Sequence, residues 1–206
     1  GAAYIYDQIA DVTNAWGNVK KLTAPDGAAN NFFGQSVAQS GNLVLVGANG
    51  HLGNRGAAYL FDGGAAWAQV QKLMASDAAV GDGFGTSVSM SNSCAVIGAP
   101  NKAGYTGAAY VFKNDAGTWS QAKKLVASDG AANDRFGTAV ALSGDYAYVT
   151  AVRGNATAGA VYVFHKDAGG VGNWGQIGRY TAADGANGDQ FGYALGVSGE
   201  RMALGA

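Results

Sequence analysis

Carboxylates recur at fixed distances from the four tryptophans of the sequence. An Asp follows every Trp by ten residues, and Asp or Asn follows five residues later. These positions are Asp77/Asp82, Asp129/Asp134, Asp184/Asp189 and Asp26/Asn31. Paired carboxylates in a loop could hold a metal ion or another ligand, but Asp also caps turns by accepting backbone N–H hydrogen bonds. Because the pair recurs in every copy, we favour the structural role.

Basic and aromatic residues share this spacing. Five residues after each Trp stands a base: Lys21, Lys72, Lys124 or Arg179. We expect these bases either to pair with a loop Asp or to protect an outer strand from edge pairing. The tryptophans themselves (Trp16, Trp67, Trp119 and Trp174) are expected to cover sheet edges or to pack between repeated units. An exposed Trp would instead offer a stacking platform for a sugar.

Side chains that commonly carry catalysis are scarce. The chain has two histidines, His51 and His165, and one cysteine, Cys94, which we expect to be a small buried residue. We find no histidine spacing typical of a metal site, no G-x-S-x-G sequence, no P-loop and no H-E-x-x-H sequence. The sequence therefore predicts no catalytic residues, no metal site and no enzymatic activity.

The composition narrows the class of protein. The net charge is -1, from 13 Lys and Arg against 14 Asp and Glu, which gives no electrostatic signature for a nucleic-acid partner. The 48% apolar content argues against disorder, and no apolar run is long enough to span a membrane. Glycine is abundant, at 34 residues, and Glu200 is the only glutamate. Short Val, Tyr and Phe runs among Gly and Asp indicate strands joined by turns.

The sequence contains four copies of one unit with a period of 51 to 55 residues. Each copy has a Gly-Ala start followed by Tyr, one Trp, and a Phe-Gly pair seventeen residues after that Trp. We predict strands over 33–38, 43–47, 56–61 and 70–73, with Ser-Gly or Ser-Asn turns joining the first two strands of each unit. Four-stranded antiparallel units repeated in this way are typical of a β-propeller.

These features resemble the FG-GAP repeat family, whose blades build the integrin α-subunit head and many bacterial surface proteins. The pairs at Phe33, Phe84, Phe136 and Phe191 supply "FG", and Gly98-Ala99-Pro100 supplies "GAP". The resemblance implies a propeller, commonly of seven blades, that serves recognition in a secreted or cell-surface protein. Members often carry an Asp-rich calcium loop between the first two strands. Here that connection is only a Ser-Gly or Ser-Asn turn, so we expect no calcium and no other cofactor.

The resemblance covers the whole chain, and we expect residues 1–206 to form a single all-β propeller domain. The phase of the repeats gives three complete blades and two half-blades, because the chain opens on a third strand and stops on a second strand. Two arrangements fit this phase. The last strands could pair with the first and close a four-blade ring, or the chain could be a fragment of a larger propeller.

Function in a repeat protein is best sought where the copies differ. The connections between second and third strands, 49–55, 100–106 and 152–158, have equal lengths but different residues. Unless they are plain solvated loops, they predict ligand contacts at His51, Asn54, Arg55, Asn101, Lys102, Tyr105, Arg153 and Asn155.

We expect a non-catalytic extracellular recognition or adhesion module that binds a protein or a glycan through its loop surfaces. The alternative is a structural subunit of an extracellular or surface assembly that self-associates through open blade edges.

Overall fold

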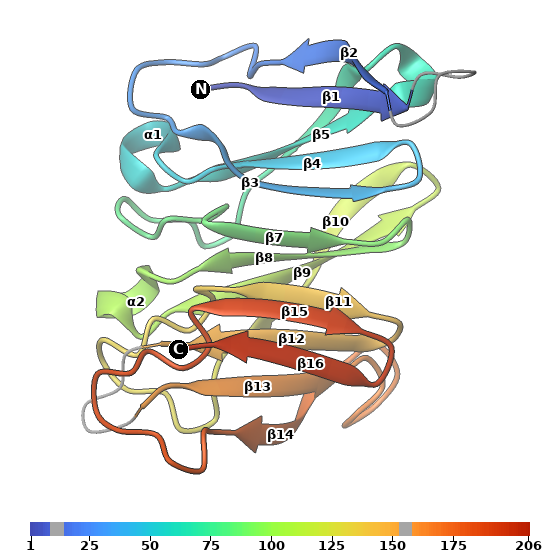
Figure 1. Ribbon diagram of the computed structural model, residues 1–206. Coiled ribbons are helices and arrows are strands. Elements are labelled where there is room, and N and C mark those ends of the chain that lie inside the picture. Colours follow the sequence, from blue (N-terminus) through green and yellow to red (C-terminus); the bar gives the residue numbers. More distant parts are fainter. Residues whose placement is uncertain (9–14, 153–157) are drawn as a thin grey trace.

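The computed structural model describes residues 1–8, 15–152 and 158–206, and strands dominate it (Figure 1). Three antiparallel sheets have four strands each, and two further sheets have two strands each. Strand order follows chain order within every sheet, as in a propeller blade. No helix in these ranges is long and apolar enough to cross a membrane. The expected all-β architecture of repeated four-stranded units is therefore present.

We name the sheets in chain order. The N-terminal half-blade is β1 (Ala3–Gln8) and β2 (Trp16–Leu22), and the C-terminal half-blade is β15 (Ala194–Ser198) and β16 (Arg201–Gly205). The first blade is β3 (Phe33–Ser40), β4 (Leu43–Ala48), β5 (Ala57–Asp62) and β6 (Ala68–Leu73). The second is β7 (Ser87–Met90), β8 (Cys94–Ala99), β9 (Ala108–Asp115) and β10 (Thr118–Leu125). The third is β11 (Val140–Ser143), β12 (Tyr146–Ala151), β13 (Ala160–His165) and β14 (Gly175–Tyr180).

Three short helical turns interrupt the strands. They are α1 (His51–Asn54), the 3-10 turn η1 (Gly63–Ala65) and α2 (Lys102–Tyr105). The four strands predicted for the first blade are confirmed, with ends shifted by one or two residues. One difference concerns the Phe-Gly pairs, because β7 and β11 begin only at Ser87 and Val140. There the Phe forms an isolated parallel bridge to the preceding blade instead of starting the strand.

The Phe-Gly pair has a clear structural role. Phe84 is fully buried and packs edge-on against Tyr110, with 5.6 Å between ring centroids. Gly85 has φ +91, and a Cβ there would lie 2.5 Å from the carbonyl oxygen of Ala57 in the preceding blade. A side chain at this position would therefore meet both an unfavourable backbone conformation and a backbone clash. The pair locks adjacent blades together.

The hydrophobic core lies between blades. One cluster joins the N-terminal half-blade to the first blade, the second joins the first and second blades, and the third joins the second and third blades. Trp119 and Trp174 are buried in the second and third clusters, and Trp67 packs partly buried against the first cluster. This confirms that Trp packs between blades. Trp16 is 65% exposed because no described residue covers its side of the N-terminal half-blade.

The array is open in this structure. Strands β1 and β2 form one sheet and β15 and β16 another, and no pairing between described strands joins these two sheets. The two termini lie at different levels of the stack in Figure 1. The four-blade ring therefore stays an unconfirmed prediction.

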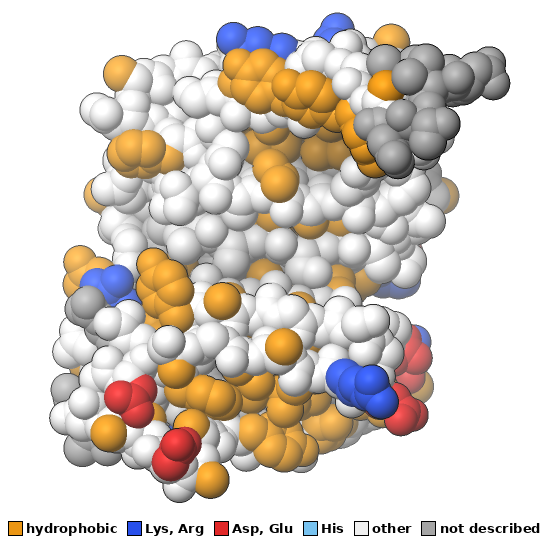
Figure 2. Space-filling view, viewed as in Figure 1, with side chains coloured by type: hydrophobic (Ala, Val, Ile, Leu, Met, Phe, Trp, Pro, Cys, Tyr) orange, Lys and Arg blue, Asp and Glu red, His pale blue; other side chains and the backbone are white. Residues whose placement is uncertain are grey.

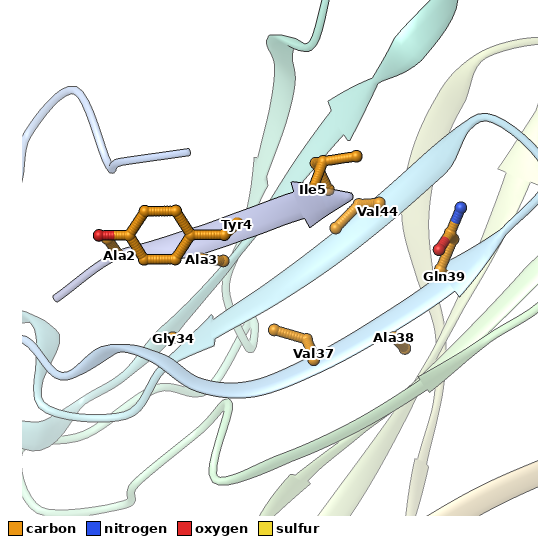
Figure 3. Close-up of a pocket in the computed structure, with 9 residues that line it drawn as sticks. All are labelled: Ala2, Ala3, Tyr4, Ile5, Gly34, Val37, Ala38, Gln39 and Val44. Atoms are coloured by element: carbon orange, nitrogen blue, oxygen red, sulfur yellow. The ribbon is translucent and has the colours of Figure 1, made fainter. Parts of the chain in front are cut away.

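The open end has a groove, shown in Figure 3, of about 420 Å³ between β1 and the β3–β4 hairpin. Val37 in this groove is 60% exposed, whereas its counterparts Val88 and Val140 are 9% and 8% exposed. The latter two are covered by the neighbouring blade. The groove is thus a blade interface that lacks its covering strands among the described residues.

Candidate functional site

Turns α1 and α2 lie at the same end of the blades, opposite the β3–β4 hairpin turn (Figure 1). Both contain two consecutive residues with left-handed backbone: Leu52 and Gly53 in α1, and Ala103 and Gly104 in α2. We call this end the loop face; it comprises 49–55, 100–106 and the connections between blades at 26–32, 77–83 and 129–135. The first two of the predicted ligand-binding connections, 49–55 and 100–106, therefore form compact turns on one face.

Backbone hydrogen bonds across blade junctions order the loop face. The N–H groups of Gly81 and Gly83 donate to the carbonyls of Gly53 and Asn54, at 3.1 and 2.7 Å. The next junction repeats the pattern, with the Arg135 N–H donating to the carbonyl of Tyr105 at 2.7 Å. Each turn is therefore tied to the connection that leaves its own blade, and the backbone of the face is held in place.

At three of the four predicted pairs, the first residue is an Asp that clamps two blades. The hydroxyl of Tyr110 donates to Asp77 at 2.7 Å, and the Lys124 ammonium lies 2.8 Å from the same carboxylate. The same arrangement joins Asp26 to Tyr59 and Lys72, and Asp129 to Tyr162 and Arg179. The expected pairing of the recurring base with a loop Asp is thus confirmed at three positions.

The clamp shifts the pKa values of its members. Burial alone would raise the pKa of Asp77, but the hydrogen bonds from Lys124 and Tyr110 and the nearby positive charges lower it to about 2. The pKa of Tyr110 is raised by burial and by its hydrogen bond to Asp77. The carboxylate is therefore ionised and the tyrosine protonated at neutral pH, which is the pairing the clamp requires.

The second acid of the pair caps its own turn. Oδ2 of Asp82 accepts from the Ala79 N–H, and Oδ2 of Asp134 accepts from the Ala131 N–H, each at 2.7 Å. The structural interpretation of the Asp pairs, as turn caps and contacts between blades, is confirmed for these residues.

The copies differ in the side chain that contacts the second residue of the Asp pair. In the second blade the buried Lys102 ammonium lies 2.7 Å from Asp82 and also donates to the backbone carbonyl of Asp77. In the first blade the corresponding residues are His51 and Asn31, whose Nδ1 and Nδ2 lie 3.2 Å apart. Two neutral side chains in contact therefore replace the buried ion pair.

His51 lines an open cavity of about 430 Å³ on the loop face, together with Asp26, Asn31 and Asn54. Its Nε2 lies 2.6 Å from the Lys72 ammonium and 3.8 Å from Asp26. Burial and the charge of Lys72 lower the pKa of His51, so the imidazole is neutral and Nε2 accepts a hydrogen bond from Lys72. The cavity wall therefore presents hydrogen-bonding groups, and the described residues that line it include no Ser, Thr, Cys or Lys.

The predicted ligand residues fall into three groups. Asn54, Arg55 and Tyr105 are exposed on the loop face, with Asn101 partly buried beside them. His51 and Lys102 are buried and belong to the contacts between blades. Arg153 and Asn155 lie outside the described residues. Sequence reasoning did not single out Leu52, Val80 and Arg135 on this face. Each is a bulky residue at a position where another copy has Gly or Ala, and that difference between copies could have identified them.

Among the described residues, no group of three or more His, Cys, Asp or Glu side chains is placed to hold a metal ion. The expectation that no cofactor binds stays a prediction. A family model described as "FG-GAP repeat" matches residues 16–61, 67–112, 119–164 and 174–206. A search of curated proteins found no match.

Proposed function

The chain belongs to the FG-GAP repeat family, and we propose that it is a non-catalytic recognition module that binds an extracellular ligand through its loop face. FG-GAP repeats are generally adhesion or recognition modules. The observation that carries the proposal is the contrast between the two ends of the blades. The hairpin end joins its strands by connections of unequal length, such as 41–42 between β3 and β4 and 166–174 between β13 and β14. The loop face instead presents different side chains from each copy on backbone that is hydrogen-bonded across the junctions.

The chemistry of the loop face supports binding without catalysis. Its carboxylates Asp26, Asp77 and Asp129 are engaged in clamps, and the buried Lys102 is paired with Asp82. The single thiol, Cys94, has its pKa raised by burial to about 11, so it is a poor nucleophile at neutral pH. Secretion or surface location is proposed with this function, as the family resemblance implies.

A steric block tests which end of the blades binds. In a Cys94→Ala background, Arg55→Cys on the loop face or Asn42→Cys on the hairpin face is coupled to a polyethylene glycol maleimide. Both positions are exposed. Arrays of glycans and of purified extracellular matrix proteins then report binding. We expect binding by the unmodified protein, loss with the Arg55→Cys conjugate and retention with the Asn42→Cys conjugate.

Two outcomes would contradict the proposal. The first is that the unmodified protein binds nothing on either array. The second is that the conjugate at position 42 loses binding while the conjugate at position 55 keeps it. Both conjugates carry the same polymer on an exposed turn, so a general effect of the polymer would appear in both.

A second candidate function, a structural subunit that self-associates through its open end, has one observation in its favour. The N-terminal half-blade exposes Tyr4, Tyr6 and Trp16, and Tyr4 lines the groove of Figure 3. Figure 2 shows hydrophobic side chains gathered at this end of the molecule. Such a surface suits contact with another polypeptide.

A further inference from the structure

Several bulky loop-face residues adopt backbone conformations that usually favour Gly or Asn. Leu52 has φ +48, Tyr105 φ +65 and Arg135 φ +55. Left-handed backbone costs roughly 1 kcal/mol for an ordinary side chain, and most for bulky ones. Burial does not compensate for this strain at Leu52 and Tyr105, because these residues are 54% and 45% exposed.

The other copies show that the fold does not require these side chains. The position of Leu52 is Ala103 in the second blade, and that of Tyr105 is Asn54 in the first. The position of Arg135 is Phe32, Gly83 or Gln190 in the other copies. Val80, which is 67% exposed, corresponds to Ala29 and Ala132. Leu52 and Tyr105 are both strained and exposed, whereas Val80 is exposed and Arg135 is strained but half-buried. Strained or exposed side chains that the fold does not need point to a binding role.

These side chains belong to neighbouring parts of the loop face. A Cβ on Gly53, next to Leu52, would lie 3.6 Å from Cγ1 of Val80, so the α1 turn and this side chain are neighbours. The Arg135 guanidinium lies 5.1 Å from the ring centroid of Tyr105, a cation–π contact that holds the charged group in place. We name Leu52, Val80, Tyr105 and Arg135 the loop-face row.

The charge that this face offers to a partner is positive. The carboxylates of the first three blade connections are occupied by the clamps and turn caps described above. By contrast, Arg55 and Arg135 have no ion-pair partner among residues 1–8, 15–152 and 158–206. A stacked guanidinium without a carboxylate is suited to bidentate binding of a partner carboxylate.

From this placement we infer that the loop-face row binds an acidic polypeptide segment whose apolar side chains contact Leu52, Val80 and Tyr105 and whose carboxylate pairs with Arg135. The inference rests on the proposed function and names its partner. The aliphatic members favour a polypeptide over a glycan, because exposed Leu and Val offer no stacking face or hydrogen bond to a sugar. Tyr and Arg are also the residue types most enriched at protein-binding hot spots.

The test replaces residues of the loop-face row by the residues found at the equivalent positions of other copies. A random peptide library displayed on phage is selected on the intact protein, and the most enriched peptide is synthesised. Its affinity is measured for Tyr105→Asn and Arg135→Gln, which copy Asn54 and Gln190, and for a variant that adds Leu52→Ala and Val80→Ala. The matched control, Asp145→Asn with Lys166→Gln, removes an exposed ion pair at the hairpin end.

We expect enriched peptides with Asp or Glu beside apolar residues. Arg135→Gln and Tyr105→Asn should each weaken binding about tenfold, and the combined variant should abolish it, while the control binds as the parent does. Thermal unfolding midpoints of the single variants should equal or exceed the parent's, since Asn adopts left-handed backbone readily, so lost binding would not reflect lost folding.

Three results would overturn the inference. The enriched peptides could lack carboxylates, the combined variant could bind them as the parent does, or the protein could bind glycans on an array and no peptide. In the last case the proposed function would survive, provided that the loop-face variants reduce glycan binding. If neither peptides nor glycans bind, the proposed function fails as well.

Discussion

At the scale of single residues, two blade junctions place different pairs of side chains at the same two positions. Lys102 and Asp82 form a buried ion pair, which needs both charges to be present. His51 and Asn31 occupy the same positions as a neutral pair, and Lys72 donates to the imidazole. Only the first junction therefore contains a group that changes charge in mildly acidic solution.

The presence of His51 at the first junction predicts that the free energy of unfolding depends on pH. Burial and Lys72 lower the pKa of His51 in the folded state below its ordinary value of 6.5, so the unfolded chain binds the proton more readily. The contribution of neutral His51 is complete above that ordinary value and is lost as the pH falls through and below it. We expect the free energy of unfolding, measured in urea, to decrease as the solution goes from about pH 7 to about pH 5.

The second junction supplies the control. The double variant Asn31→Asp with His51→Lys copies Asp82 and Lys102, and its unfolding free energy should depend less on pH over the same range. His165 is present in both proteins, so its contribution cancels in the comparison. Equal pH dependence of parent and double variant would contradict the assigned role of His51.

The residue scale also shows the limit of sequence reasoning. The spacing located the clamp acids and bases, because they recur at constant distances from Trp. It could not reveal that His51 and Lys102 are buried, because their partners come from connections 20 or more residues away. It also passed over Arg135, whose stacking on Tyr105 depends on contact between two loops.

At the scale of elements, one strand position reports whether a blade interface is complete. Val37, Val88 and Val140 all stand four residues after the Phe of a Phe-Gly pair. The alternation predicted a first strand in each blade, and all three are present, although β7 and β11 begin after the Phe-Gly pair. Exposure differs only because a neighbouring blade covers Val88 and Val140, whereas Val37 lines the groove in Figure 3. The position of a blade in the array therefore determines whether this valine is buried. Comparing the repeats in the sequence one by one does not reveal that difference.

This difference predicts unequal effects of one substitution. Val88→Ala should lower the free energy of unfolding by about 2 kcal/mol, from lost apolar burial and the cavity that remains. Val37→Ala should change it by less than about 0.5 kcal/mol, because the side chain is exposed. Both variants lose the same atoms from equivalent strands, so propensity effects cancel. Equal losses in chemical denaturation would show that β3 is covered in solution.

At the scale of the whole molecule, the blades form an open stack with two unlike surfaces. The loop face carries ordered turns, strained bulky residues, and two arginines that have no carboxylate partner in the part of the chain that the structure describes. The open end carries exposed aromatic residues and an apolar groove. The first surface supports ligand recognition, and the second supports self-association.

Hydrogen exchange measured by mass spectrometry, with and without the selected acidic peptide, separates these two accounts most directly. Recognition through the loop face predicts slower exchange in α1, in α2 and in the connections 77–83 and 129–135, with β1 and the β3–β4 hairpin turn unchanged. The contrary result is protection confined to β1, β3 and the groove between them, increasing with protein concentration whether or not the peptide is present.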